Sequence, residues 1–225
     1  MQNAIKKTQI YLVDDHPLVR ESLANLINQQ PDLAVCGEAD SAGRALREIV
    51  ALAPDLAIID ISLKESSGLE LIKAVKAQLP QLAVVVLSMH DEQLYAERCI
   101  RAGAAGYVMK RESSKQIVAA VREVMADRMG VSSQIAAVFA RKFVGGRQAR
   151  GESPISSLSD RELEVFGLLG RGMATRQVAE NMNVSIKTVQ AYCGRIKQKL
   201  HISTATELLR EAIHWHDQNN EGVVY

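Results

Sequence analysis

Cysteine is scarce in this sequence: Cys36, Cys99 and Cys193 are the three in a chain of 225 residues. An odd number of widely separated cysteines does not fit a disulfide framework and favours reduced thiols in a cytosol. The cysteines also do not form a cluster with the spacing of metal ligands. No apolar run approaches the roughly 20 residues that a membrane-spanning helix needs, and the opening MQNAIKKTQ is too polar for a signal peptide. We therefore expect a soluble, cytoplasmic protein.

An excess of charge of one sign is also missing, since 27 Lys and Arg residues nearly balance 26 Asp and Glu residues. The overall charge therefore does not indicate nucleic acid, a membrane surface or an acidic substrate, and any such partner must bind a local patch. The composition, 47% hydrophobic and 24% charged, is that of a globular protein, and the length is sufficient for two domains.

Short apolar runs rich in β-branched residues recur along the first half of the chain, and a helical pattern fills each gap between them. The runs are QIYLV, LAVCGEA, LAIID, AVVVLS and GYVMK. Runs that are apolar on both faces are typical of strands in a parallel sheet covered by helices. Pro31, Pro54 and Pro80 each lie between a helical pattern and the next run, where a helix should end. We predict an α/β fold with a doubly wound, five-stranded parallel sheet of the flavodoxin-like kind.

Beyond Gly130 the strand patterns disappear. Residues 132–143 predict a short amphipathic helix, and GGRQARGESPISS has the composition of a linker. From Leu158 onward the pattern is that of a small all-α domain with four helical segments. The predicted organisation is a first domain at 1–128, a linker with its helix at 129–157, and a helical domain at 158–225.

Polar side chains lie at the ends of four of the predicted strands, at the edge of the sheet where chemistry takes place in such folds. They are Asp14, Asp15, Asp60, Ser88 and Lys110. A single Asp at a strand end more often caps the next helix, but convergence on one edge favours a site. Three carboxylates there predict a hard divalent cation, Mg²⁺ or else Mn²⁺. Lys110 would supply positive charge to a phosphoryl oxygen, and Ser88 a hydrogen bond.

These residues, within IYLVDDHPLVR, IIDISLKESSGLELI, VVVLSMHD and GYVMKRES, resemble the receiver domain of two-component response regulators. The resemblance implies that Asp60 is the nucleophile, which becomes a 4-aspartylphosphate by accepting a phosphoryl group from a sensor histidine kinase. It implies that Asp15 ligates the metal directly, that Asp14 reaches it largely through water, and that the backbone carbonyl of Ser62 is a further ligand.

The same resemblance implies a switch, in which Ser88 moves toward the phosphoryl group and Tyr107 turns into the vacated space. A partly buried core aromatic is the simpler alternative for Tyr107. His16 is expected to pack or to lead into the following helix. The family usually has proline four positions after the phosphorylated Asp, where this chain has Lys64.

The C-terminal part contains a helix, turn, helix pattern. Ser159 and Glu162 form a predicted capping box, Thr175 opens a second helix, and Ser185 caps a third. In the third helix, one stripe is apolar and the opposite face is polar and basic; the stripe is Val189, Cys193, Ile196 and Leu200, and the face is Lys187, Gln190, Ala191, Gly194, Arg195 and Gln198. Such a face suits the DNA major groove, although composition alone would favour an ordinary solvated helix.

The stretch LSDRELEVFGLLGRGMATRQVAENMNVSIKTVQAYCGRIKQKL resembles the LuxR-type helix-turn-helix domain that ends regulators of the NarL/FixJ type. The resemblance implies DNA binding by two sets of residues. Base contacts fall on Gln190, Ala191 and Gly194, and backbone contacts on Thr175, Lys187, Thr188, Tyr192 and Lys199, with Arg195 helping at phosphates. Gln190 is the expected adenine reader, because the small side chains at 191 and 194 offer little hydrogen bonding.

The resemblances together imply a phosphorylation-activated transcription regulator, not an enzyme. Its expected partners are the histidine kinase, double-stranded promoter DNA, RNA polymerase and, on activation, a second copy bound through ELLREAIHW. One alternative is a phosphatase of α/β fold with an aspartyl-phosphate, but that class would want a carboxylate at position 62, which is Ser. Another is a receiver that signals by protein contact alone.

Overall fold

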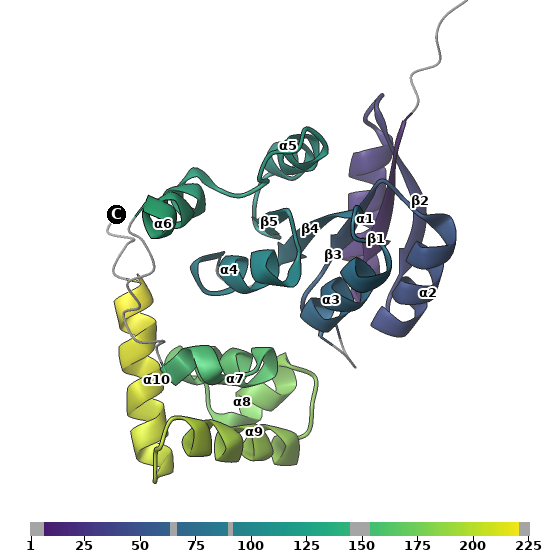
Figure 1. Cartoon of the computed structure of the whole chain (residues 1–225). Coiled ribbons are helices and arrows are strands. Elements are labelled where there is room, and N and C mark those ends of the chain that lie inside the picture. The colour runs from purple at the N-terminus through teal and green to yellow at the C-terminus, as the bar shows by residue number, and fades with distance from the viewer. Residues whose placement is uncertain (1–6, 64–66, 90–91, 145–153, 221–225) are drawn as a thin grey trace, which may run out of the picture. The chain divides into compact units, whose positions relative to one another are not determined.

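A computed structural model describes residues 7–63, 67–89, 92–144 and 154–220, and the chain divides into two compact units, 1–146 and 147–225 (Figure 1). Lys64, which replaces the usual proline, lies outside the described residues. All three cysteines are free thiols. Across the described part of the chain, no helix combines the length and apolar character needed to cross a membrane.

The first unit is built around a five-stranded parallel sheet, as the sequence predicts, and the strand order is β2-β1-β3-β4-β5. The strands are β1 (Thr8–Val13), β2 (Leu33–Ala39), β3 (Leu56–Ile59), β4 (Ala83–Ser88) and β5 (Gly106–Met109). They alternate with α1 (Pro17–Asn28), α2 (Ala42–Leu52), α3 (Gly68–Gln78), α4 (Glu92–Ala102) and α5 (Ser114–Met125). The winding direction reverses between β1 and β3, and the carboxyl ends of these strands therefore border the crevice where such sheets bind ligands.

Helices cover both faces of this sheet, which explains why the strands are apolar throughout. On one face, α1 and α5 pack against alternate strand residues in a single core; its members include Ile10, Leu12, Leu23, Ile27, Ile58, Val85, Val121 and Val124. The residues between them point to the other face, where the hydroxyl of Tyr11 donates a 2.6 Å hydrogen bond to Glu48 of α2. The helices α2, α3 and α4 lie beside one another there.

The segment after α5 turns back onto the sheet. The N–H of Gly130 donates to the carbonyl of Ala105, and the carbonyl of Gly130 accepts from the N–H of Tyr107. These hydrogen bonds continue the sheet beyond β5. The N–H of Ser132 then donates to the Glu92 carboxylate of α4, 3.0 Å away, just before α6 (Ser133–Val144). Hence α6, which the sequence places in a linker, belongs to the first compact unit.

The second unit is helical, as predicted. It contains a 3-10 turn, η1 (Pro154–Ser157), and the helices α7 (Asp160–Gly170), α8 (Thr175–Asn181), α9 (Ile186–Lys199) and α10 (Ala205–Asn220). The predicted caps are confirmed, since Ser159 and Glu162 form a capping box on α7 and Ser185 accepts from the N–H of Thr188. Asn183 has a φ of 54° in the turn before α9.

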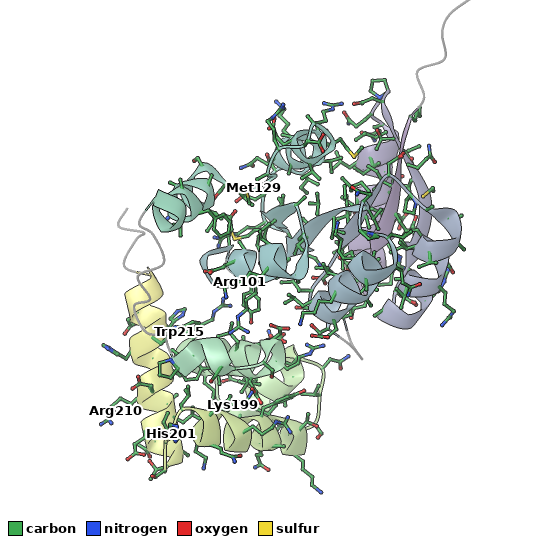
Figure 2. The ribbon with its side chains drawn as sticks, viewed as in Figure 1. Arg101, Met129, Lys199, His201, Arg210 and Trp215 are labelled. Carbon is green, nitrogen blue, oxygen red and sulfur yellow. The ribbon has the colours of Figure 1, made fainter. Side chains whose placement is uncertain are left out.

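The core of this unit joins α7, α9 and α10. Phe166 on α7 and Trp215 on α10 have ring centroids 5.4 Å apart. Trp215 is labelled in Figure 2. Val189 and Ile196 of the predicted apolar stripe are fully buried, whereas Cys193 and Leu200 are half-buried. Of the four residues of the predicted stripe, Val189 and Ile196 are therefore the ones that pack completely within the core.

Candidate functional sites

The two adjacent aspartates at residues 14 and 15 lie at the carboxyl end of β1, and Asp60 follows β3 beside them. The N–H of Asp60 donates to the carbonyl of Val13 at 2.8 Å, which brings the two strand ends together. The three carboxylates are buried, with side chains at most about one-twentieth exposed. The sequence prediction that they meet at one edge is therefore reproduced in the geometry.

Lys110, which follows β5, reaches across this edge to two of the carboxylates. Its Nζ lies 2.7 Å from Oδ2 of Asp60 and 2.7 Å from Oδ2 of Asp14. The Lys110 side chain is itself only 8% exposed. The ammonium thus partly neutralises a concentration of negative charge that water does not screen.

Burial and charge act in opposite directions on these groups. Burial raises the pKa of Asp60, and the repulsion from Asp14 adds to this, while Lys110 lowers it without cancelling the rise. For Lys110, burial lowers the pKa, but the attraction of Asp60 and Asp14 outweighs burial and raises it above its usual value. The site therefore holds an ammonium ion that does not lose its proton near neutral pH.

Asp15 is the carboxylate that Lys110 does not neutralise. Among the described residues, no hydrogen bond is donated to Oδ1 of Asp15, although this atom is buried. A buried carboxylate oxygen without a donor is costly, and a cation is the usual remedy. The ligand atoms of Asp14, Asp15, His16 and Asp60 all lie within 4.8 Å of one another. The residues present thus fit a hard, oxygen-preferring divalent cation.

Two backbone features hold Asp60 in place. The N–H of Ser62, whose carbonyl is the predicted further ligand, donates to Oδ1 of Asp60 at 3.2 Å. Gly68 at the start of α3 packs so closely that a Cβ there would lie 2.1 Å from the Asp60 carbonyl oxygen. Sequence reasoning missed Gly68, and its only signal is a glycine shortly after the aspartate that ends a strand.

The two predicted switch residues lie on neighbouring strands. Ser88 is the last residue of β4 and is fully buried, and its carbonyl accepts a 2.7 Å hydrogen bond from the N–H of Lys110. Tyr107 lies within β5, is 1% exposed, and pairs through its N–H with Gly130. Tyr107 is thus connected to the segment that leads into α6.

The predicted DNA-contacting residues lie on α9, except Thr175, which opens α8. The polar face is open to solvent: Lys187, Gln190, Ala191, Gly194 and Arg195 are exposed, while Thr188 and Tyr192 are half-buried. The Arg195 guanidinium stacks over the Tyr192 ring, 4.7 Å from its centroid. A cation on an aromatic face is partly ordered before any ligand arrives.

Lys199, at the end of α9, has a partner that the sequence pattern did not indicate. Its Nζ donates to Oε2 of the buried Glu162 at 2.6 Å and to the Ser157 carbonyl at 3.1 Å. Oε1 of Glu162 also lies 3.3 Å from Nε of Arg195. Burial raises the pKa of Glu162, but Lys199 and Ser159 outweigh burial and hold it below its usual value.

Comparison with known proteins matches a family to each of the two units. The model of the response regulator receiver domain matches residues 10–122, and that of bacterial regulatory proteins of the luxR family matches residues 156–212. The chain belongs to the response regulators. It carries a receiver domain followed by a LuxR-type DNA-binding domain, and this is a family of transcription regulators, not of enzymes.

Relatives match along almost the whole chain. The DNA-binding transcriptional activator DevR/DosR of Mycobacterium tuberculosis is 34% identical over 88% of this chain and 91% of its own. The transcriptional activator protein ExaE of Pseudomonas putida is 35% identical over 91% of this chain and 95% of its own. A solved LuxR-family response regulator from Aurantimonas is 32% identical with a TM-score of 0.57, over 62% of this chain and 99% of that one. The phosphatase alternative loses its support.

Proposed function

We propose that this response regulator is controlled by phosphorylation of Asp60 and that it then binds promoter DNA through α9. The observation that supports the first part most directly is the buried Asp60 carboxylate, contacted by Lys110 and by the N–H of Ser62. It lies beside two further carboxylates at the crevice between β1 and β3. A carboxylate held in this way needs only a partner of opposite charge and an aligned phosphoryl donor.

In the proposed reaction, a carboxylate oxygen of Asp60 attacks the phosphorus of a phosphohistidine on a sensor kinase. An O–P bond forms, the P–N bond breaks, and the imidazole nitrogen keeps the electron pair. Lys110 attracts a phosphoryl oxygen as charge builds up, and the hydroxyl of Ser88 donates a hydrogen bond to another. Mg²⁺, held by Asp14, Asp15, Asp60 and the Ser62 carbonyl, would neutralise the remaining phosphoryl charge.

We infer that the signal leaves the receiver through Ser88 and Tyr107. Support comes from their burial on adjacent strands and from the hydrogen bond that the N–H of Tyr107 donates to the carbonyl of Gly130. A change in the packing of Tyr107 would therefore act on the segment before α6. Such a change shifts a population between two packings and requires no new fold.

At the DNA, α9 would lie in the major groove of a promoter. Gln190 is exposed in the first half of the helix and suits an adenine edge, while Lys187 near its start suits a phosphate. One such helix makes a small contact, so useful specificity needs two half-sites and a dimer. Leu209 and Ile213 of α10, within the segment predicted for dimer contact, are about two-fifths exposed. The proposal also includes RNA polymerase as a partner of the regulator at the promoter and the cytoplasm as its location.

Labelling with a small phosphodonor tests the phosphoacceptor. Acetyl phosphate with Mg²⁺ should label the wild-type chain, and Asp60→Asn should abolish the label, because an amide oxygen is a poor nucleophile. Asp40→Asn, an exposed aspartate after β2, is the matched control and should be labelled normally. Undiminished labelling of Asp60→Asn would place the acceptor elsewhere. Footprinting on genomic DNA of the source organism, with and without the phosphodonor, tests whether phosphorylation promotes binding to promoter DNA.

A further inference from the structure

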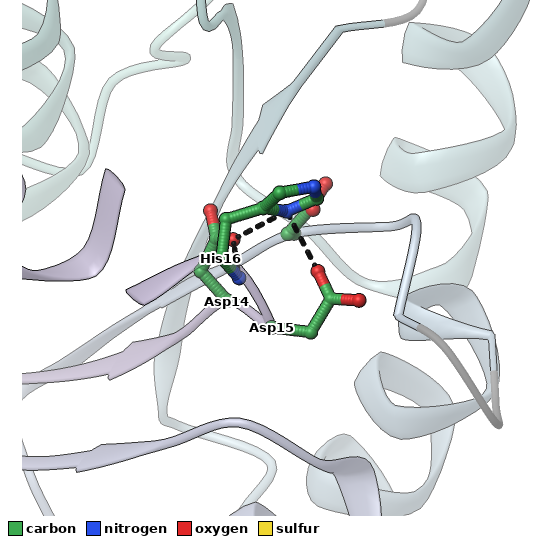
Figure 3. A group of neighbouring side chains, drawn as sticks. Asp14, Asp15 and His16 are labelled. Atoms are coloured by element: carbon green, nitrogen blue, oxygen red, sulfur yellow. Dashed lines mark hydrogen bonds and ion pairs between the residues drawn. The ribbon is translucent and has the colours of Figure 1, made fainter. Parts of the chain in front are cut away.

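The His16 imidazole lies against the open side of the carboxylate cluster. His16 follows Asp15 directly and precedes Pro17, the first residue of α1. Its Nδ1 is 2.8 Å from Oδ1 of Asp15 and 3.2 Å from Oδ1 of Asp14 (Figure 3). A fourth candidate ligand, a ring nitrogen, thus lies close to the three carboxylates.

The ring nitrogen lies closest to the carboxylate that needs a partner. Lys110 contacts Asp14 and Asp60, whereas Oδ1 of Asp15 is buried and accepts no hydrogen bond from the described residues. Nδ1 of His16 is the near neighbour of that oxygen, although the contact does not have hydrogen-bond geometry. A cation that neutralises Asp15 on this side would therefore come within range of the imidazole.

The backbone of His16 is fixed, but its side chain is not confined. The His16 N–H donates to Oδ1 of Asp14 at 2.9 Å, and its carbonyl accepts from the N–H of Arg20 in the first turn of α1. The side chain is 61% exposed. The ring can consequently adjust to an incoming ion by rotating about its own bonds, without disturbing the packing of the core.

The chemistry of imidazole determines which ions gain from such a ligand. Mg²⁺ prefers oxygen ligands and water, whereas the divalent ions of the first transition series, from Mn²⁺ onward, accept imidazole nitrogen more readily than Mg²⁺ does. We propose that His16 is a ligand of the cation bound at Asp15 and Asp60, and that it makes the site favour a transition-metal ion such as Mn²⁺ over Mg²⁺. This inference rests on the metal site of the proposed function and adds which ion that site prefers.

Direct detection of the nitrogen is the sharpest test. The full-length protein, stripped with chelator and loaded with Mn²⁺, is examined by pulsed electron paramagnetic resonance for a coordinated ¹⁴N nucleus. Growth with ¹⁵N-histidine should change the signal to that of ¹⁵N. In His16→Gln the histidine nitrogen signal should disappear, while His214→Gln, an exposed histidine of the other unit, should leave it intact.

Calorimetric titration measures the selectivity. His16→Gln should bind Mn²⁺ about tenfold more weakly, by analogy with the loss of supporting groups at metal sites, while its Mg²⁺ affinity stays within about twofold because Mg²⁺ gains little from nitrogen. Circular dichroism verifies that the variant is folded. Equal weakening for both ions would overturn the selectivity.

The outcomes separate this inference from the metal site itself. Asp15→Asn should abolish tight binding of either ion. If the wild-type protein binds Mn²⁺ in an Asp15-dependent manner but shows no histidine nitrogen, then His16 only neutralises Asp15 and the inference fails while the site stands. If Asp15→Asn binds both ions normally, the metal site of the proposed function fails, and this inference fails with it.

Discussion

Replacing Lys110 by Met removes the ammonium from a buried cluster of carboxylates and keeps a side chain of similar length. The lost contacts are those to Asp14 and Asp60, each 2.7 Å long. Removing one partner of a buried ion pair costs about 3–5 kcal/mol when the other stays charged. Because Asp60 can take up a proton instead, we expect the free energy of unfolding to fall by about 3 kcal/mol at pH 8 and about 1 kcal/mol at pH 5.

The direction of this pH dependence follows from the pKa of Asp60. Burial already raises that pKa in the wild-type protein, and Lys110 opposes the rise. Without Lys110 the folded pKa of Asp60 moves further above the unfolded value of about 3.9. The folded state then holds a proton that the unfolded state releases, so stability falls as pH rises through the interval between the two pKa values.

Urea unfolding in excess chelator measures this effect in the metal-free protein. Circular dichroism follows both units, and fluorescence of Trp215, the single tryptophan of the chain, follows the second unit. Lys115→Met, at an exposed position on α5, is the control and should change stability little. A loss for Lys110→Met that is the same at pH 5 and pH 8 would refute the reasoning, since it would show that no carboxylate takes up a proton.

Three further changes test the remaining contacts. Gly68→Ala should displace the Asp60 backbone and slow labelling by acetyl phosphate, whereas Gly43→Ala, which has space for a methyl group, should be labelled normally. Gln190→Ala should weaken binding to a footprinted site by about 1–3 kcal/mol and leave binding to random DNA unchanged, and equal losses for both DNAs would contradict base reading. Lys187→Ala should weaken binding to both DNAs and reduce the slope of log affinity against log salt concentration by about one unit. Glu162→Gln should lower the free energy of unfolding of the second unit by about 1–3 kcal/mol, as followed by Trp215 fluorescence. Because the pKa of Glu162 is lowered in the folded state, this difference from the wild type should shrink as pH falls below the unfolded pKa of about 4.3. A difference that stays constant down to pH 3 would argue against the ion pair.

Much of the fold was predictable because its signals are local. In a strand that is buried on both faces, the residues that point to either face are apolar. In a helix with one buried face, the apolar residues recur with a period near 3.6 residues. The carboxyl ends of parallel strands meet at one edge, so Asp14, Asp60 and Lys110 could be placed together from sequence alone. The capping box of Ser159 and Glu162 depends on a spacing of three residues and was equally visible.

The features that were missed depend on distances between elements far apart in the sequence. Periodicity shows which face of a helix is apolar but not what covers it, so the hydrogen bonds of Gly130 to the edge of β5 were not foreseen. Close approach of Gly68 to the Asp60 carbonyl is a property of packing and leaves no pattern in the sequence. The same holds for Lys199, whose partner Glu162 lies 37 residues earlier.

The pairing of Lys199 with Glu162 and the cluster at Asp15 show how a structural carboxylate differs from one that binds. Glu162 is buried, but it accepts hydrogen bonds from Lys199 and from the N–H of Ser159, so its charge is compensated within the protein. Asp15 is buried to a similar degree, yet Oδ1 receives no hydrogen bond from the described residues. A buried charge without a donor raises the free energy of the folded state unless a cation compensates it. Compensation within the fold therefore assigns Glu162 a role in holding α9, whereas Asp15 Oδ1, with the exposed His16 ring 2.8 Å away but no hydrogen-bond donor, is the atom that fits the proposed cation.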